Sequence, residues 1–140
     1  MKYLILTALL ALRSFQETLP RQTLVISNLD EVKGQLYIGW YNSAASFPEG
    51  GKSVYRKIVE VENKDSIEVS FENIPPGIYA IAVFLDKNGN GKIDKNILGV
   101  PKEKYGFSNN KYPLTRAATF NEAAFTIGEK ELSIPIKLKG

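Results

Sequence analysis

Alternation of hydrophobic and polar residues is the dominant pattern of the chain beyond residue 22, and it predicts β-strands. Residues 34–41 (GQLYIGWY) place Leu36, Ile38 and Trp40 on one face, and residues 66–72 (SIEVSFE) alternate apolar side chains with Glu and Ser. A period of two residues is typical of a strand with one buried face. Similar shorter patterns predict further strands at 23–27, 53–61, 123–127 and 131–138.

Residues 78–85 (IYAIAVFL) are apolar on both faces, which predicts a strand in the middle of a sheet. A buried helix is the competing interpretation, but the Pro-Pro-Gly turn before the run and the Asn- and Gly-rich segment after it favour a strand. About seven short strands predict an all-β protein, a single β-sandwich. One long polar loop is expected over residues 86–113, and loops of this length are usually functional.

The N-terminal segment has a different character. An apolar run from Leu4 to Leu12 follows Lys2, which is the length of a signal-peptide core and too short to span a bilayer. We predict a signal peptide at residues 1–16 and a single domain at 17–140, with no membrane span after removal of the signal. A first strand or buried helix of the domain is the alternative. Export from the cytoplasm is therefore expected.

The amino-acid composition limits the catalytic groups, metal ligands and partners that are available to the chain. The chain contains no Cys and no His, which excludes thiol nucleophiles, imidazole bases and Cys or His zinc sites. The net charge is +3 with no basic cluster, so nucleic acid is not an expected partner. Any metal would be held by oxygen atoms, which implies a hard cation such as Ca²⁺.

Residues 86–94 (DKNGNGKID) carry the oxygen spacing of a calcium-binding loop. Oxygen-bearing side chains stand at the first, third, fifth and ninth positions, with Gly91 at the sixth, where such a loop turns sharply. The backbone carbonyl of the seventh residue is a further ligand in these loops. The predicted metal ligands are therefore Asp86, Asn88, Asn90, Lys92 and Asp94.

The loop departs from the EF-hand pattern at its end and in its frame. Ile97 stands where a bidentate Glu is usual, and a strand instead of a helix precedes the loop. Asn96 or Glu103 could complete the coordination. With few negative charges, we expect weak binding, with a dissociation constant of about 10⁻⁴ to 10⁻³ M. A metal-free turn is the alternative, because Asn-Gly pairs also favour tight turns.

Aromatic residues gather after this loop. Tyr105, Phe107 and Tyr112 lie close together in sequence and are possible ligand contacts, because aromatic rings stack on sugars. They could instead fold back and cover one end of the sandwich.

Four motifs in close order resemble an uncharacterised bacterial family, DUF2141. They are P-P-G-x-Y-A at 75–80, D-x-N-x-N-G-K-x-D at 86–94, L-G-x-P-x-E at 98–103 and Y-G-F-S-N-N at 105–110. The resemblance implies a small exported protein in the periplasm or at the exterior of a Gram-negative bacterium. It also implies that the single domain is an Ig-like or prealbumin-like β-sandwich. It assigns neither an activity nor a ligand to any residue.

Three functions remain open at this point. The first is an exported, non-catalytic cell-envelope module with a calcium loop, acting in binding or assembly with an unknown envelope protein or a glycan. The second is a glycan hydrolase that uses paired carboxylates from Asp86, Asp94 and Glu103. The third is a metal-free structural domain that binds a partner protein at an edge strand.

Overall fold

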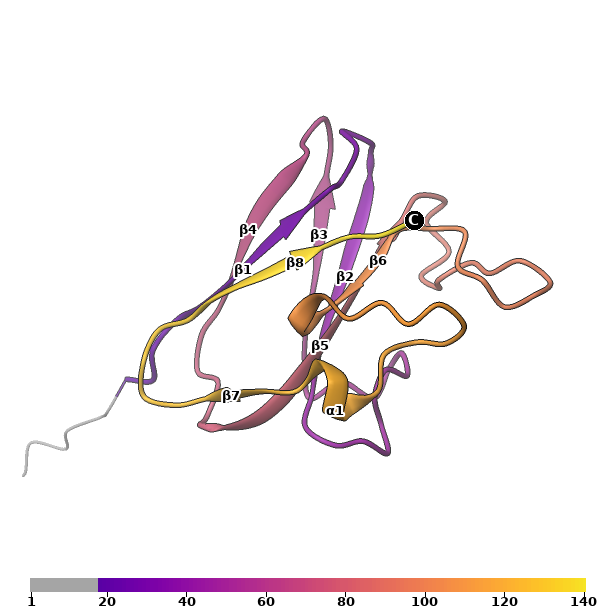
Figure 1. Ribbon diagram of the computed structural model, residues 1–140. Coiled ribbons are helices and arrows are strands. Elements are labelled where there is room, and N and C mark those ends of the chain that lie inside the picture. Colours follow the sequence, from indigo (N-terminus) through magenta and orange to yellow (C-terminus); the bar gives the residue numbers. More distant parts are fainter. Residues whose placement is uncertain (1–17) are drawn as a thin grey trace, which may run out of the picture.

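Two β-sheets form the framework of the computed structural model, which describes residues 18–140 (Figure 1). The smaller sheet has three strands, in the order β4 (Ser66–Phe71), β1 (Gln22–Ser27) and β8 (Ser133–Lys137). The larger sheet runs β3 (Tyr55–Val61), β2 (Gly34–Tyr41), β5 (Gly77–Asp86) and β6 (Tyr105–Phe107), and β7 (Phe125–Ile127) also pairs with β5. The prediction of an all-β sandwich is confirmed, whereas the predicted signal peptide lies outside the described residues.

Strand β5 is central, as its continuous apolar sequence predicts. It pairs antiparallel with β2 along one edge and with β6 and β7 along the other. Strands β3 and β8 lie at the edges of their sheets. Strand β8 pairs with β1 in parallel, and Pro135, which lacks an N–H group, is tolerated at such an edge.

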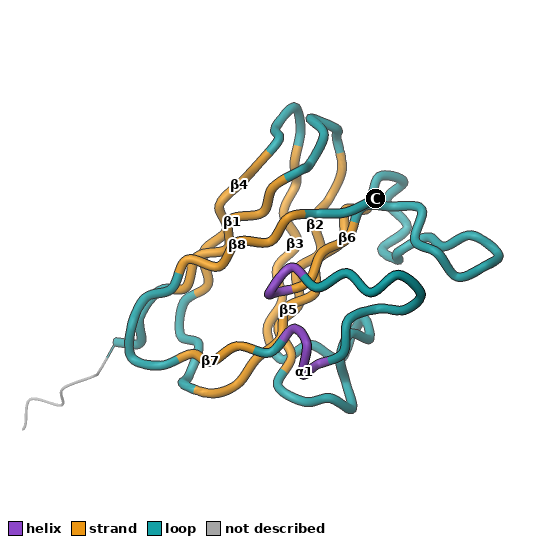
Figure 2. The backbone as a smooth tube through the Cα atoms, viewed as in Figure 1, coloured by secondary structure: helices purple, strands orange, loops and turns teal. Residues whose placement is uncertain are grey.

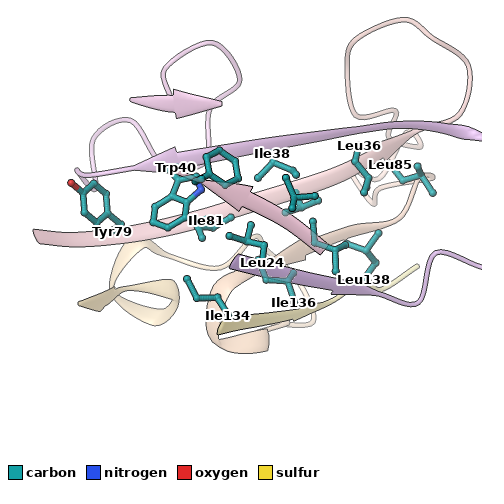
Figure 3. Close-up of a cluster of buried hydrophobic side chains, with 14 of the residues drawn as sticks. Leu24, Leu36, Ile38, Trp40, Tyr79, Ile81, Leu85, Ile134, Ile136 and Leu138 are labelled. Atoms are coloured by element: carbon teal, nitrogen blue, oxygen red, sulfur yellow. The ribbon is translucent and has the colours of Figure 1, made fainter. Parts of the chain in front are cut away.

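The main hydrophobic core lies between the two sheets (Figure 3). Alternate residues of β2 point into it, and Trp40 makes aromatic contacts with Phe71, Tyr79 and Phe125. Leu24 and Ile136 face it from the smaller sheet. Residues 18–140 supply both sheets and this core, so this part of the chain has the elements needed to fold on its own.

A second, smaller hydrophobic cluster covers the other face of β5. It contains Tyr41, Phe47, Ala80 and Phe107, together with residues around the short helix α1 (Phe120–Ala123). Strand β5 is therefore buried on both faces, which explains why its sequence does not alternate. The helix begins at Thr119 with a capping box that Glu122 completes.

The prediction of one long loop over residues 86–113 is wrong for the second half of that range. Strand β6 and a 3₁₀ turn, η1 (Ser108–Asn110), occupy this part of the chain. Three residues are too few to show a period in the sequence, and β6 forms because β5 and the segment after β8 pair with it. Gly106 permits this approach, since a Cβ there would lie 2.7 Å from Ile136 Cγ2.

Within residues 18–140, no helix has the length and apolar character required to cross a membrane. The described helical segments are α1 and the η1 turn, which are four and three residues long.

Candidate metal site in the loop after β5

Asp86 is the centre of the loop that carries the calcium-like spacing. It is the last residue of β5, and only 1% of its surface is exposed. Its two carboxylate oxygens accept hydrogen bonds from the backbone N–H groups of Gly89 at 3.0 Å and Gly91 at 2.8 Å. Both glycines have positive φ, at +74° and +73°, a conformation that glycine adopts without strain. The loop therefore wraps around a buried carboxylate.

Three further side chains of the predicted ligand set converge on one another. The amide of Asn90 donates to Asp94 Oδ1 at 2.7 Å, and the amide of Asn88 donates to Asp94 Oδ2. The Asn90 amide is the largest cause, with Asn88 a further one, of a lowered pKa for the Asp94 carboxyl. The third, fifth and ninth positions of the loop thus meet around the Asp94 carboxylate.

Glu103 closes the loop from outside it. Its carboxylate is buried, with the residue 5% exposed, and accepts from the N–H of Lys87 at 2.8 Å and of Asp94 at 2.9 Å. The two N–H groups belong to the second and ninth residues of the loop. One carboxylate therefore ties the beginning of the loop to its end, and the chain returns alongside, with Lys102 N–H donating to the Asp94 carbonyl at 2.7 Å.

The base of the site is fixed by the residue after Glu103. The Lys104 side chain is buried and forms an ion pair of 2.7 Å with Asp30, from the turn before β2. The Lys104 carbonyl accepts from Leu85 N–H at 2.8 Å, next to Asp86. The position of the Glu103 carboxylate is thus determined by strand pairing on one side and by this ion pair on the other.

The structure does not bring Asn96 to the other predicted ligands. Its side-chain oxygen accepts from Leu98 N–H at 2.9 Å and Val100 N–H at 3.1 Å, inside its own turn. Ile97, at the twelfth position, is fully exposed. Of the two residues that were alternatives for completing the coordination, Glu103 is the one placed against the loop.

The aromatic residues after the loop do not form a shared open face. Phe107 is buried in the second cluster, so its prediction as a ligand contact is wrong. Tyr105 packs edge-on against Phe107 and against Tyr112. Burial of Tyr112 raises its pKa to about 12, and Lys139 lies 5.6 Å above its ring. Phe107 and Tyr105 pack in the second cluster, on the outer face of β5.

Carboxylates alone do not make a metal centre here. Within the described part of the chain, no group of three or more Asp, Glu, His or Cys side chains is arranged to hold an ion. An ion in this loop would therefore need amide and carbonyl oxygens as well as Asp86 and Asp94. Calcium accepts such mixed oxygen ligands, with six to eight at about 2.3–2.6 Å.

Two open hollows lie elsewhere on the surface. One of about 270 Å³ is lined by residues of η1 and β8 together with Phe125. The other, of about 340 Å³, lies beside Tyr112 and the C-terminal residues. No Asp or Glu side chain is among the residues that line either hollow, so neither holds the carboxylate pair that glycan hydrolysis requires.

Comparison with known proteins gives one match. The sequence model of a family described as "Uncharacterized protein conserved in bacteria (DUF2141)" matches residues 24–135. No curated protein and no solved structure matches the chain. The matched range begins within β1 and ends within β8, so it includes the whole loop around Asp86.

Proposed function

Since the chain belongs to the bacterial DUF2141 family, whose description names no activity, we propose a function from the geometry of its own loop. The protein is an exported, non-catalytic module of the cell envelope. Its loop 86–94, closed by Glu103, binds Ca²⁺, and the bound ion stabilises a surface that acts in binding or assembly with an envelope protein or a glycan.

The observation that carries this proposal is the arrangement around Asp86. In calcium loops the first carboxylate binds the ion together with the side chains at the third, fifth and ninth positions. Here Asp86 accepts from Gly89 and Gly91 N–H, and the side chains of Asn88, Asn90 and Asp94 meet at one point. The same three side chains would therefore require little movement to share a cation.

The change that a cation requires is a rotation of two amide groups. Asn88 and Asn90 now direct N–H groups toward the Asp94 carboxylate. Rotation of each amide about its terminal bond would replace the N–H with an oxygen acceptor. Four hydrogen-bonded side-chain oxygens, two each on Asp86 and Glu103, keep their backbone partners, and each retains lone-pair capacity. Two or three negative charges favour weak binding, in the range of extracellular calcium modules.

The setting of the acids supports a non-catalytic role. Asp86 and Glu103 are buried, and all four of their carboxylate oxygens accept backbone N–H groups of the loop. A glycosidase needs one carboxylic acid that can protonate a leaving group and a second carboxylate facing the same sugar. Carboxylates that hold a loop together are poorly suited to either task, so we disfavour the hydrolase.

A metal-free structural domain is the second candidate, and one observation favours it. The loop is already internally hydrogen-bonded, with Asn88 and Asn90 oxygens accepting from Asn90 and Lys92 N–H at 3.2 and 3.0 Å. Short Asx turns of this kind stabilise a loop without an ion. The two candidates differ in one measurable property, the dependence of stability on calcium.

Thermal unfolding of residues 17–140 in EDTA and in millimolar calcium tests the proposal. Calcium at ten times its dissociation constant adds about 1.4 kcal/mol to the stability of the folded state, which raises Tm by roughly 3–6 °C for a domain of this size. Asp86→Asn should abolish the rise, because it removes the buried charge at the centre of the loop.

The matched control is Asp65→Asn, which removes an exposed carboxylate from the turn between β3 and β4. This variant should keep the full calcium response. An unchanged Tm of the unsubstituted protein in saturating calcium would reject the ion and leave the metal-free domain as the function.

A further inference from the structure

A narrow turn with an apolar tip protrudes from the molecule next to the loop of Asp86. In Figure 1 the segment that follows β5 extends beyond the sheets, on the side of β6, and Figure 2 shows that it contains no strand or helix. Lys95 and Pro101 form an isolated bridge at the base of the turn. At its tip, Ile97 is 102% exposed, Leu98 is 82% exposed and Val100 is 53% exposed.

These apolar side chains contribute little to the fold. They lie outside both hydrophobic clusters, so their burial does not explain why they are apolar. Isolated exposed aliphatic residues are common on soluble proteins, but a contiguous set on a protruding element marks an interaction surface. The 95–101 turn therefore presents an apolar surface that can be buried against a non-aqueous phase or another molecule.

The backbone N–H groups at the tip already have hydrogen-bond partners within the turn. Asn96 accepts three hydrogen bonds from the tip, at its side-chain oxygen from Leu98 and Val100 N–H and at its carbonyl from Gly99 N–H at 2.9 Å. Asn96 N–H in turn donates to the Val100 carbonyl at 2.9 Å. An unsatisfied peptide group is costly to remove from water. The turn avoids that cost for the N–H groups of the three residues that follow Ile97.

Exposed lysines stand before and after this tip in the sequence. They lie at both ends of the turn and in the adjoining loop, at Lys87, Lys92, Lys95 and Lys102. Two acidic side chains of the same segment do not lie on the surface. Asp86 and Glu103 are buried, and their carboxylates accept hydrogen bonds from backbone N–H groups. Asp94 is half-buried and bonded to two amides. The segment is therefore locally basic although the chain carries a net charge of only +3.

We propose that the 95–101 turn docks on an anionic lipid surface. Ile97, Leu98 and Val100 enter the boundary between headgroups and acyl chains, and the flanking lysines contact lipid phosphates. An apolar tip flanked by exposed lysines matches the chemistry of such an interface. A protein partner fits less well, because three side chains on a narrow turn fall far short of the ~800 Å² that each partner buries in a stable interface.

The apolar tip and the two lysines at its base, Lys95 and Lys102, are not among the proposed calcium ligands. Docking should occur in EDTA, since the turn is formed by Asn96 without an ion. Calcium in loop 86–94 would add positive charge beside the turn and should strengthen docking. Failure of the calcium proposal would appear as an unchanged Tm in calcium, whereas failure of the docking proposal would appear as no co-sedimentation with anionic vesicles in EDTA.

Co-sedimentation with vesicles tests the docking. Residues 17–140 are mixed in EDTA and low salt with vesicles of equimolar phosphatidylcholine and phosphatidylglycerol, or with phosphatidylcholine alone. We expect binding to the anionic vesicles that falls as salt is raised, because salt screens the lysines. Ile97→Ser with Leu98→Ser should weaken the partition coefficient by at least about tenfold. Lys95→Gln with Lys102→Gln should weaken it by roughly fivefold per lysine.

A matched control uses another exposed isoleucine. Ile78 is 59% exposed and lies at the opposite end of β5 from Asp86. Ile78→Ser should leave vesicle binding unchanged. Equal losses from Ile78→Ser and from the tip variant would mean that hydrophobic residues act nonspecifically, and would overturn the assignment of the turn.

The absence of cysteine permits a direct measurement of insertion. Leu98→Cys and Ile78→Cys each create a single site for an environment-sensitive fluorophore. The label at position 98 should shift to the blue and gain intensity on addition of anionic vesicles, and the label at position 78 should not change. Failure of the unlabelled, unsubstituted protein to sediment with anionic vesicles at low salt would reject a lipid surface.

Discussion

The two asparagine-rich segments of the chain, 88–94 and 108–110, use the same side chain for different purposes. In the first, the amides of Asn88 and Asn90 donate to one exposed-loop carboxylate, Asp94. In the second, the amide of Asn109 donates to two backbone carbonyls at the end of α1, at 3.1 and 2.9 Å. Asn110 bonds to Pro135 O at 3.3 Å and accepts from Lys137 N–H at 2.8 Å.

The partners of the amides explain the difference in role. Asn110 satisfies backbone groups at the free edge of β8, and Asn109 joins the 3₁₀ turn to the helix, so the Y-G-F-S-N-N motif holds elements together. The amides of the calcium-like loop instead surround a carboxylate, and a cation could replace them there. Asparagines bonded to backbone carbonyls indicate a structural role, whereas asparagines gathered around a carboxylate are compatible with ion binding.

The largest effect is expected from Ser108→Ala in the structural segment. The Ser108 hydroxyl is fully buried, accepts from Ile81 N–H at 2.9 Å and donates to the Ala123 carbonyl at 2.5 Å. Alanine would leave both buried backbone groups without a partner, which should lower the free energy of unfolding by about 3 kcal/mol. Urea denaturation measures this loss, and the calcium-dependent change in Tm should survive. A loss below about 0.5 kcal/mol would contradict the structural role.

A smaller loss is expected from Asn109→Ala. This residue has φ of +64°, so alanine removes two hydrogen bonds and also adds backbone strain, for a total of about 2 kcal/mol. Asn109→Gly is the matched variant, because glycine accepts the same φ without strain. The glycine variant should be the more stable of the two in urea. The reverse order would mean that backbone conformation is not part of the effect.

Asn88→Ala and Asn90→Ala should change stability in EDTA by less than about 0.5 kcal/mol, because both side chains are exposed. Each should nevertheless weaken calcium binding by about tenfold, since it removes one neutral oxygen ligand. Isothermal titration calorimetry with calcium measures the second effect. A large loss of stability in EDTA with unchanged calcium binding would mean that Asn88 and Asn90 have a structural role and do not bind the ion.

The smallest effect concerns pH. The folded-state pKa of Asp94 is lowered, with the Asn90 amide as the largest cause, so the folded form binds fewer protons than the unfolded form. The stability from this group is present above the unfolded pKa of about 4 and is lost as pH falls through the lower folded pKa. Carboxyl-carbon NMR should show the pKa of Asp94 rising toward its usual value in Asn90→Ala. An unchanged pKa would remove Asn90 as its cause.

Strands could be predicted from the sequence where the pattern of buried and exposed positions is regular along the chain. Residues 34–41 alternate and form β2 over the same range, and residues 78–85 are apolar throughout and form the central strand β5. Both patterns are local consequences of which faces are buried. Strand β6 had no such pattern, because its three residues are held by pairing with β5 and by the close approach of Ile136 to Gly106.

The sequence by itself determined the strand framework, the exclusion of thiol and imidazole chemistry, and the order of oxygen-bearing residues from Asp86 to Asp94. These properties depend on residue type and on spacing within a few positions. Only the tertiary structure decided that Glu103 closes the loop and Asn96 does not, that Phe107 is buried, and that Ile97 and Leu98 form an exposed tip. The position of Glu103 and the burial of Phe107 depend on contacts with residues outside their own segment, such as Lys87 and Phe47. No local pattern encodes which of these groups will meet.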